Sequence, residues 1–125
     1  MTIQQRKEKG AALIEEMMGS QAAADTRAAW RKISPDFESY IVEFLAGEIW
    51  SRPSLDLKSR SLVTIAALAA MGRPRALDLN IRMALKNGAS REEITETLLQ
   101  IAPYAGFPAA WEALATLDQV RGQTG

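Results

Sequence analysis

The chain has 125 residues, with 15 basic side chains balanced by 15 acidic ones, and it contains neither cysteine nor histidine. This length suits one domain that buries a core without disulfide bonds, and the missing cysteine excludes thiolate–metal sites and thiol redox chemistry. The missing histidine removes the usual proton shuttle near neutral pH, so acid–base chemistry must use carboxylates, guanidinium groups, lysine, tyrosine or backbone donors.

The N-terminal half of the chain has helical periodicity. Apolar residues at helical spacing predict a helix over residues 3–18, which ends before Gly19. The alanine-rich segment 20–32 is ambiguous and fits a loop followed by a short helix. A serine N-cap, a first-turn proline and an acid at 34–36 predict a second helix that extends to about Trp50.

The C-terminal half contains four further helical segments. The segment 57–71 is apolar on nearly every side, which places it at the centre of a bundle or at a subunit contact. Residues 74–88 form the fourth helix, with a proline at its start and an Asn-Gly stop, and a capping box at 90–93 begins the fifth. The sixth runs over 108–120. These patterns predict an all-α fold, a compact bundle of about six helices in a single domain, 1–125.

Neither a membrane nor nucleic acid is expected as a partner. Residues 1–10 are charged and lack the apolar core of a signal peptide, and the longest apolar stretch, 65–71, is too short to cross a bilayer. The balanced charge favours neither nucleic acid nor a membrane surface. Together with the absence of cysteine, these features lead us to expect a soluble, cytoplasmic protein.

Glu48 lies within an apolar helix face. Residues three and four apart share a face, so Glu48 falls on one stripe with Tyr40, Ile41, Phe44 and Leu45. Its carboxylate is therefore expected to point toward the core or a cleft. Because an isolated buried carboxylate is costly, two interpretations stay open: a buried Glu–Arg ion pair, or a carboxyl group poised as an acid or base.

The fourth helix carries a second polar residue, Asn80, on its apolar face. A buried amide needs several hydrogen-bond partners, and a single inward Asn is more often a satisfied core amide than a ligand-binding group. On another face, Asp78, Arg82 and Lys86 follow one another at spacings of four. That spacing is typical of a solvated salt-bridge ladder.

Two arginines and two aromatic residues complete the set of candidates. Arg52 and Arg60 flank the loop after the second helix, where a pair of arginines can hold a carboxylate in a bidentate manner. The alternative is that they anchor this loop to a nearby acidic side chain. Tyr104 and Trp111, near the turn at 106–108, are interpreted as core packing or as the wall of a pocket.

Four strings in the chain resemble the carboxymuconolactone decarboxylase family and follow the family's order. They are GEIWSRP at 47–53, RSLVTIA at 60–66, NGASREEI at 87–94 and YAGFPAA at 104–110. The resemblance covers nearly the whole chain. It implies the all-helical alkylhydroperoxidase-like fold, assembled as a homo-oligomer, either a trimer or a hexamer.

The chain departs from the family pattern at the positions that carry imidazole and thiol groups. The pattern has histidine where this chain has Lys58 and Asn80, cysteine at Ala105, and a further histidine close to Ala115. The peroxidase branch of the fold needs a CxxC pair and a nearby histidine. The resemblance therefore disfavours alkylhydroperoxidase activity here.

The resemblance implies a cofactor-independent lyase, or a proton-shift isomerase, acting on a small carboxylated lactone such as 4-carboxymuconolactone or on a related acid. Loss of CO2 from such a lactone pushes electrons into its conjugated carbonyl, so the reaction requires no metal and no organic cofactor. Glu48 would be the acid/base and Asn80 would orient the substrate. The residues that would bind substrate carboxylate, oxyanion or ring are Arg52, Arg60, Arg82, Tyr104 and Trp111.

A non-catalytic alternative stays open, because every histidine of the family pattern is missing. The chain would then be a homo-oligomer of the same fold that binds a small acid or serves as a scaffold for a protein partner. A pocket in which Glu48 and at least two arginines converge would favour the enzyme. A pocket filled by Trp111 or Met83 would favour the binding protein.

Overall fold

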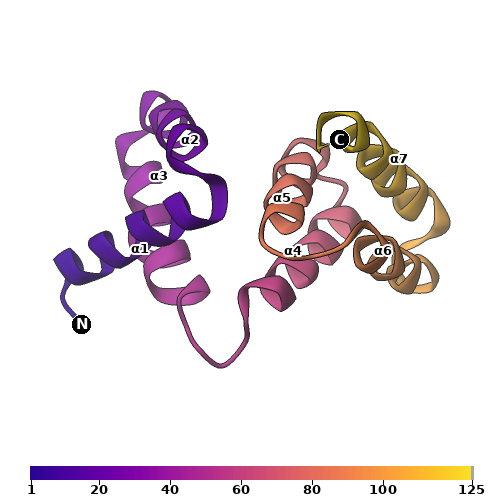
Figure 1. Cartoon of the computed structure of the whole chain (residues 1–125), viewed down its shortest axis with the longest axis horizontal. Helices are drawn as coiled ribbons and strands as arrows, with labels where there is room; N and C mark the ends of the chain where they lie inside the picture. The colour runs from indigo at the N-terminus through magenta and orange to yellow at the C-terminus, as the bar shows by residue number, and fades with distance from the viewer. Residues whose placement is uncertain (125) are drawn as a thin grey trace. The chain divides into compact units, whose positions relative to one another are not determined.

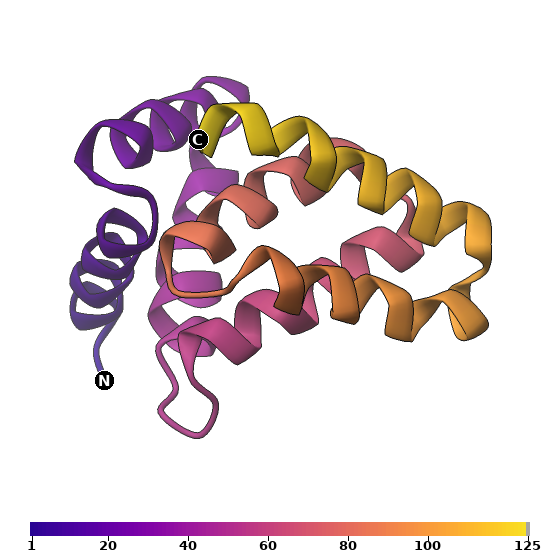
Figure 2. The same ribbon diagram turned by 45° about the vertical axis from the view of Figure 1, so that its right-hand side comes forward.

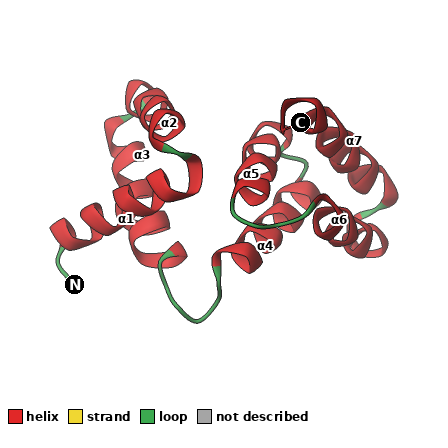
Figure 3. Cartoon of the chain, viewed as in Figure 1, coloured by secondary structure: helices red, strands yellow, loops and turns green. Residues whose placement is uncertain are grey.

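The computed structural model describes the backbone of residues 1–124 and the side chains of residues 1–120. It divides into two compact units, Met1–Leu55 (unit 1) and Asp56–Gly125 (unit 2). Within residues 1–124 the chain consists of helices joined by loops, and no strand is present (Figure 3). The all-α fold predicted from the sequence is confirmed.

Unit 1 contains three α-helices and one π-helix. These are α1 (Ile3–Met18), α2 (Ser20–Ile33), α3 (Pro35–Tyr40) and the π-helix η1 (Ile41–Trp50). Gly19, whose φ of 89° suits a residue without a side chain, is the only residue between α1 and α2. Helix α1 lies across η1 (Figure 1), and α2 packs against both α1 and α3.

Two segments of unit 1 differ from the sequence-based expectation. The alanine-rich segment after Gly19 is a complete helix of 14 residues, rather than a loop and a short helix. The second predicted helix extends to Trp50 as expected, but its C-terminal ten residues form the π-helix η1. In a π-helix the hydrogen bonds run from i to i+5, so residues four and five apart share a face.

Helix α1 and η1 cross at two glycines. A Cβ atom on Gly10 would overlap the carbonyl oxygen of Val42, and one on Gly47 would overlap the carbonyl oxygen of Arg6. The two backbones are therefore in direct contact, which only glycine permits. The small face of η1 is buried in this crossing, and the core of unit 1 consists of Ile14, Ala23, Val42 and Ala46.

Unit 2 contains four α-helices. They are α4 (Leu57–Met71), α5 (Pro74–Lys86), α6 (Arg91–Ala105) and α7 (Phe107–Thr124). Helix α4 packs against the other three, and α7 packs against α5 and α6 (Figure 2). Apolar side chains from all four helices form one core, with fully buried members Ile65, Ile81, Ile94, Leu98 and Val120.

The predicted stop at Gly72 and the predicted capping box at 90–93 are confirmed, whereas the N-cap of α4 at Asp56 was not predicted. The Asp56 carboxylate accepts the Ser59 amide at 2.7 Å at the start of α4, and Gly72 ends that helix in the left-handed conformation, with φ of 68°. The Ser90 hydroxyl and the Glu93 carboxylate form the capping box of α6. Pro103 lies inside the last turn of α6, although a proline within a helix usually interrupts it.

Helix α4 has one buried and one open apolar face. Ser61, Ile65 and Ala69 are buried within unit 2, whereas Val63 and Met71 are 60% and 59% exposed. Only one side of α4 is therefore buried in the core of unit 2, although the sequence predicted burial on nearly every side. No helix in the described part of the chain is both long enough and apolar enough to cross a membrane.

Candidate functional site

Glu48 lies on η1, and the apolar residues of its stripe do not face the core of unit 1. Tyr40, Phe44 and Leu45 are 68%, 60% and 45% exposed, so of the two expected placements of this stripe, the core or a cleft, the core is wrong. The close crossing of α1 and η1 selects the opposite, small-residue face for burial. Glu48 itself is half-buried.

The Glu48 carboxylate makes no side-chain hydrogen bond and no ion pair with any residue whose side chain is described. The buried Glu–Arg ion pair considered from the sequence is therefore not formed among these residues. Exposed aromatic and aliphatic side chains precede Glu48 along η1. A half-buried carboxyl group without a partner among the described side chains is available to a ligand. Its place on a π-helix fits the frequent occurrence of π-turns at functional sites.

The two arginines near the interhelix loop lie in different units. Arg52 follows the end of η1 in unit 1, where its amide donates to the Ile49 carbonyl at 3.2 Å. Arg60 is half-buried in the first turn of α4 in unit 2, and its amide donates to the Asp56 carbonyl at 3.0 Å. Their proposed role in carboxylate binding stays a prediction.

Asn80 is half-buried on α5 and bonds to its own helix. Its side-chain Nδ2 donates to the Ala76 carbonyl, one turn earlier, at 2.8 Å. This bond engages the amide nitrogen within the same helix. The side-chain oxygen of Asn80 accepts no hydrogen bond within the described residues, so it remains available as an acceptor.

Arg82 is paired with Asp78 on the same face of α5. Its Nε and Nη2 atoms donate to the two carboxylate oxygens at 3.0 and 3.3 Å. The two side chains are 34% and 40% exposed, and ion pairs of this kind contribute little to stability. The salt-bridge interpretation is confirmed for this pair. Arg82 would have to share its guanidinium between Asp78 and a substrate carboxylate.

Tyr104 and Trp111 lie on either side of the turn at Gly106. Their exposed fractions are 84% and 75%, so neither packs into the core of unit 2. The core-packing interpretation of these aromatics is wrong, because Ala102 and Ala110 occupy the buried positions beside them. Their role in substrate binding stays a prediction.

A charged cluster that the sequence did not reveal joins α2 to α3. The Glu38 carboxylate, 10% exposed, accepts a hydrogen bond from Arg27 Nε at 2.8 Å and two from Arg31 at 3.1 and 3.3 Å. The hydrogen bonds from Arg31 and Arg27 lower the pKa of Glu38, although burial acts to raise it. Arg27 and Arg31 lie four residues apart, and on a helix this spacing places both side chains on one face, where they can share an acidic partner. The sequence left this segment ambiguous between loop and helix, so the shared partner was not predicted.

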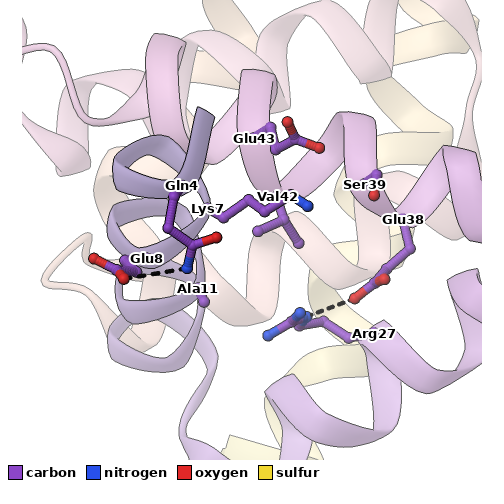
Figure 4. Close-up of a pocket in the computed structure, with 9 residues that line it drawn as sticks. All are labelled: Gln4, Lys7, Glu8, Ala11, Arg27, Glu38, Ser39, Val42 and Glu43. Atoms are coloured by element: carbon purple, nitrogen blue, oxygen red, sulfur yellow. Dashed lines mark hydrogen bonds and ion pairs between the residues drawn. The ribbon is translucent and has the colours of Figure 1, made fainter. Parts of the chain in front are cut away.

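A cavity of about 330 Å³ adjoins this cluster within unit 1. Figure 4 shows its charged lining: the Lys7 amine, the Arg27 guanidinium and the Glu38 and Glu43 carboxylates come from α1, α2, α3 and η1. The lining is completed by Gln4, Glu8, Ala11, Ser39 and Val42.

The carboxymuconolactone decarboxylase family matches residues 35–119, a span that includes parts of both units. The chain belongs to this family. It is 35% identical over 120 residues to a 4-carboxymuconolactone decarboxylase of Acinetobacter baylyi, a match that covers 96% of this chain and 90% of that protein. It is 30% identical over 107 residues to a nitrosuccinic acid decarboxylase of Metarhizium robertsii, covering 86% and 75% of the two chains. Both of these relatives of the carboxymuconolactone decarboxylase family member are named as decarboxylases.

Lys58, which the family resemblance aligns with a histidine, forms an ion pair. Its Nζ atom lies 2.8 Å from Glu93 Oε2, while Glu93 Oε1 accepts the Ser90 amide of the capping box. The hydrogen bond to Glu93 raises the pKa of Lys58, and the bonds from Lys58 and Ser90 lower the pKa of Glu93. Lys58 is therefore held as a cation, and it does not replace a neutral imidazole as a proton acceptor.

Proposed function

We propose that this protein is a cofactor-independent decarboxylase, or a proton-shift isomerase, that acts on a small carboxylated lactone such as 4-carboxymuconolactone or on a related acid. The family and the two decarboxylase relatives support the reaction class. The observation that points to Glu48 as the reacting residue is that its carboxyl group is half-buried and has no partner among the described side chains.

The substrates named for the two relatives share one chemical property. Each is a small acid with a built-in electron sink, a lactone carbonyl in one and a nitro group in the other. Breaking the bond to the carboxylate releases CO2 and leaves an electron pair, which the carbonyl or nitro group accepts as an oxyanion. A proton then adds to carbon. Such a reaction needs charge stabilisation and an acid, and no cofactor has to hold the electrons.

The residues present can supply these two requirements. We propose that Glu48 delivers the proton to carbon, because a carboxyl group can act as a general acid where imidazole is absent. Arginine side chains would bind the departing carboxylate and the developing oxyanion. Asn80 would orient the substrate through its side-chain amide. The proposed substrate-binding residues are Arg52, Arg60, Arg82, Tyr104 and Trp111.

The decisive experiment compares Glu48→Gln with Glu16→Gln on 4-carboxymuconolactone and on nitrosuccinic acid. Glu16 is exposed on α1, so it serves as a control for the loss of one carboxylate. Removing a general acid typically costs about 10²–10⁴-fold in rate, and we expect Glu48→Gln to lose activity in this range while Glu16→Gln does not.

Circular dichroism and light scattering on the same samples separate chemistry from folding. Full activity in folded Glu48→Gln would refute the acid/base role of Glu48. Loss of folding in that variant would show instead that the carboxyl group is structural. If the wild-type protein turns over neither acid but binds both, the non-catalytic small-acid-binding function is favoured. The lack of turnover would fit the cationic Lys58, which cannot accept a proton as a neutral histidine would.

We also propose that the protein works as a homo-oligomer, a trimer or a hexamer. Each unit has large apolar side chains that are more than half exposed, which is unusual for a surface that stays in water. In unit 2 they include Val63, Met71, Tyr104, Phe107 and Trp111. Burial of such residues between identical subunits would stabilise the assembly.

A further inference from the structure

The cavity of unit 1 contains charges of both signs that the proposed decarboxylation does not use. Its volume of about 330 Å³ lies at the lower end of the range of roughly 300–1,000 Å³ for small-molecule sites. Its walls come from α1, α2, α3 and η1, so the lining depends on the packing of unit 1 alone. Only a small and polar molecule suits this lining.

One side of the cavity is cationic. Arg27 uses its Nε atom to bind Glu38, which leaves the two terminal nitrogens of its guanidinium for other acceptors. Because Arg31 also binds Glu38, the three side chains together carry one positive charge rather than none. The Lys7 amine points into the same cavity (Figure 4) and has no ion-pair partner among the described residues. Two positive charges therefore face a space in which a carboxylate would find donors.

A carboxylate that no cation pairs with among the described residues, Glu43, also lines the cavity. In the view of Figure 4 the Lys7 amine is drawn between the Glu43 carboxylate and the Arg27 guanidinium. Glu43 makes no side-chain hydrogen bond and no ion pair in the described part of the chain, and it is half-buried on η1. Glu38 is engaged by the two arginines, and the Glu8 carboxylate, which accepts one hydrogen bond from Gln4 at 3.2 Å, lies beyond Gln4 and away from the Arg27 guanidinium in Figure 4. Glu43 is thus the carboxylate that can receive an ammonium group.

We propose that this cavity binds a small amino acid as a zwitterion. The ligand's carboxylate lies against Lys7 and Arg27, and its ammonium group lies against Glu43. The Ser39 hydroxyl, which also lines the cavity, supplies a further donor or acceptor. A simple carboxylic acid would leave Glu43 unpaired, and a simple amine would leave the two cations unpaired, so the site selects the molecule that carries both groups.

Ligand-observed saturation-transfer NMR on the full-length protein tests the proposal, since it detects weak ligands of large assemblies. The probes are glycine, β-alanine and γ-aminobutyrate, which differ in the spacing of their charges. Acetate, propionate and butyrate are the matched acids, and propylamine is the amine control. We expect at least one amino acid to bind roughly five- to tenfold more tightly than its matched acid and than the amine, the size of one partly exposed charge-assisted contact.

Matched variants locate the binding. Lys7→Met, which keeps the aliphatic stem, should weaken amino-acid binding, while Lys9→Met on the exposed face of α1 should not. Glu43→Gln should reduce the amino acid to the affinity of its matched acid, with Glu16→Gln as the control.

Three results would overturn the proposal. The first is that no amino acid binds, which would mean that Lys7 and Glu43 neutralise each other. The second is equal binding of the acid and the amino acid. The third is unchanged binding in Lys7→Met or Glu43→Gln. Because the readout is binding, none of these results depends on decarboxylase activity.

Discussion

Replacing Glu38 with glutamine should lower the free energy of unfolding by about 1–2 kcal/mol at neutral pH. The Glu38 side chain is 10% exposed and accepts three hydrogen bonds from Arg27 and Arg31. Glutamine keeps the shape and one acceptor oxygen but removes the charge that strengthens these bonds.

The magnitude follows from the exposure of the partners. Removing one member of a fully buried ion pair costs about 3–5 kcal/mol, because the other charge is left without water. Arg27 and Arg31 are 31% and 54% exposed, so both guanidinium groups can be rehydrated when the carboxylate is lost. The expected loss is therefore less than half of the fully buried value.

The effect should also depend on pH in a defined direction. The hydrogen bonds from Arg31 and Arg27 lower the pKa of Glu38 in the folded protein below its ordinary value of 4.5. A carboxylate with a lowered pKa contributes stability that is fully present above its unfolded pKa and is lost as the pH falls through the folded value. The difference between wild type and Glu38→Gln should thus be constant near neutral pH and shrink in acid.

Urea unfolding followed by far-ultraviolet circular dichroism measures this difference. Protein concentration must be the same in all samples, since the midpoint of an oligomer depends on it. Glu16→Gln, which removes an exposed carboxylate from α1, is the control and should leave the midpoint nearly unchanged. If Glu38→Gln is as stable as wild type at neutral pH, or if its deficit is the same in acid, the ion cluster does not stabilise unit 1 through its charge.

Three further predictions concern packing, assembly and redox chemistry. Gly10→Ala should lower the free energy of unfolding by about 2 kcal/mol or more, because the added Cβ would overlap the Val42 carbonyl oxygen. An unchanged urea midpoint would show that α1 and η1 can move apart without loss of stability. Light scattering at micromolar concentration should give the mass of a trimer or hexamer, and a monomer mass would rule out burial of the exposed apolar residues between subunits. Hydroperoxide turnover that depends on a dithiol should be undetectable, since the chain has no cysteine, and any such turnover would contradict the chemistry argued above.

Most helix ends could be predicted from the sequence, because neighbouring residues set them. The Ser34 and Ser90 hydroxyls each accept a backbone amide three residues later, and Gly72 takes the left-handed conformation that stops α4. These interactions are complete within one turn, so they do not depend on the rest of the fold. The same locality explains why the Asp78–Arg82 pair on α5 was foreseen.

Helix α2 and its charged cluster could not be predicted with the same certainty. The segment after Gly19 is rich in alanine, but it has no side-chain N-cap that marks a helix start. Its two arginines bind Glu38 on α3, which lies eleven residues after Arg27 and seven residues after Arg31. That contact exists only after α2 has packed against α3. The cluster and the cavity beside it are therefore tertiary features.

The orientation of the stripe that contains Glu48 was likewise decided by tertiary structure. The sequence by itself determined that 41–50 is helical and apolar apart from two carboxylates, at Glu43 and Glu48. It could not show which face is buried, because both faces are apolar and the π-helical turn alters the spacing of residues that share a face. The contact between the backbones of Gly10 and Gly47 settled the choice, since only the small-residue face of η1 lets α1 approach so closely. This packing leaves Tyr40 and Phe44 exposed and Glu48 half-buried without a partner among the described residues.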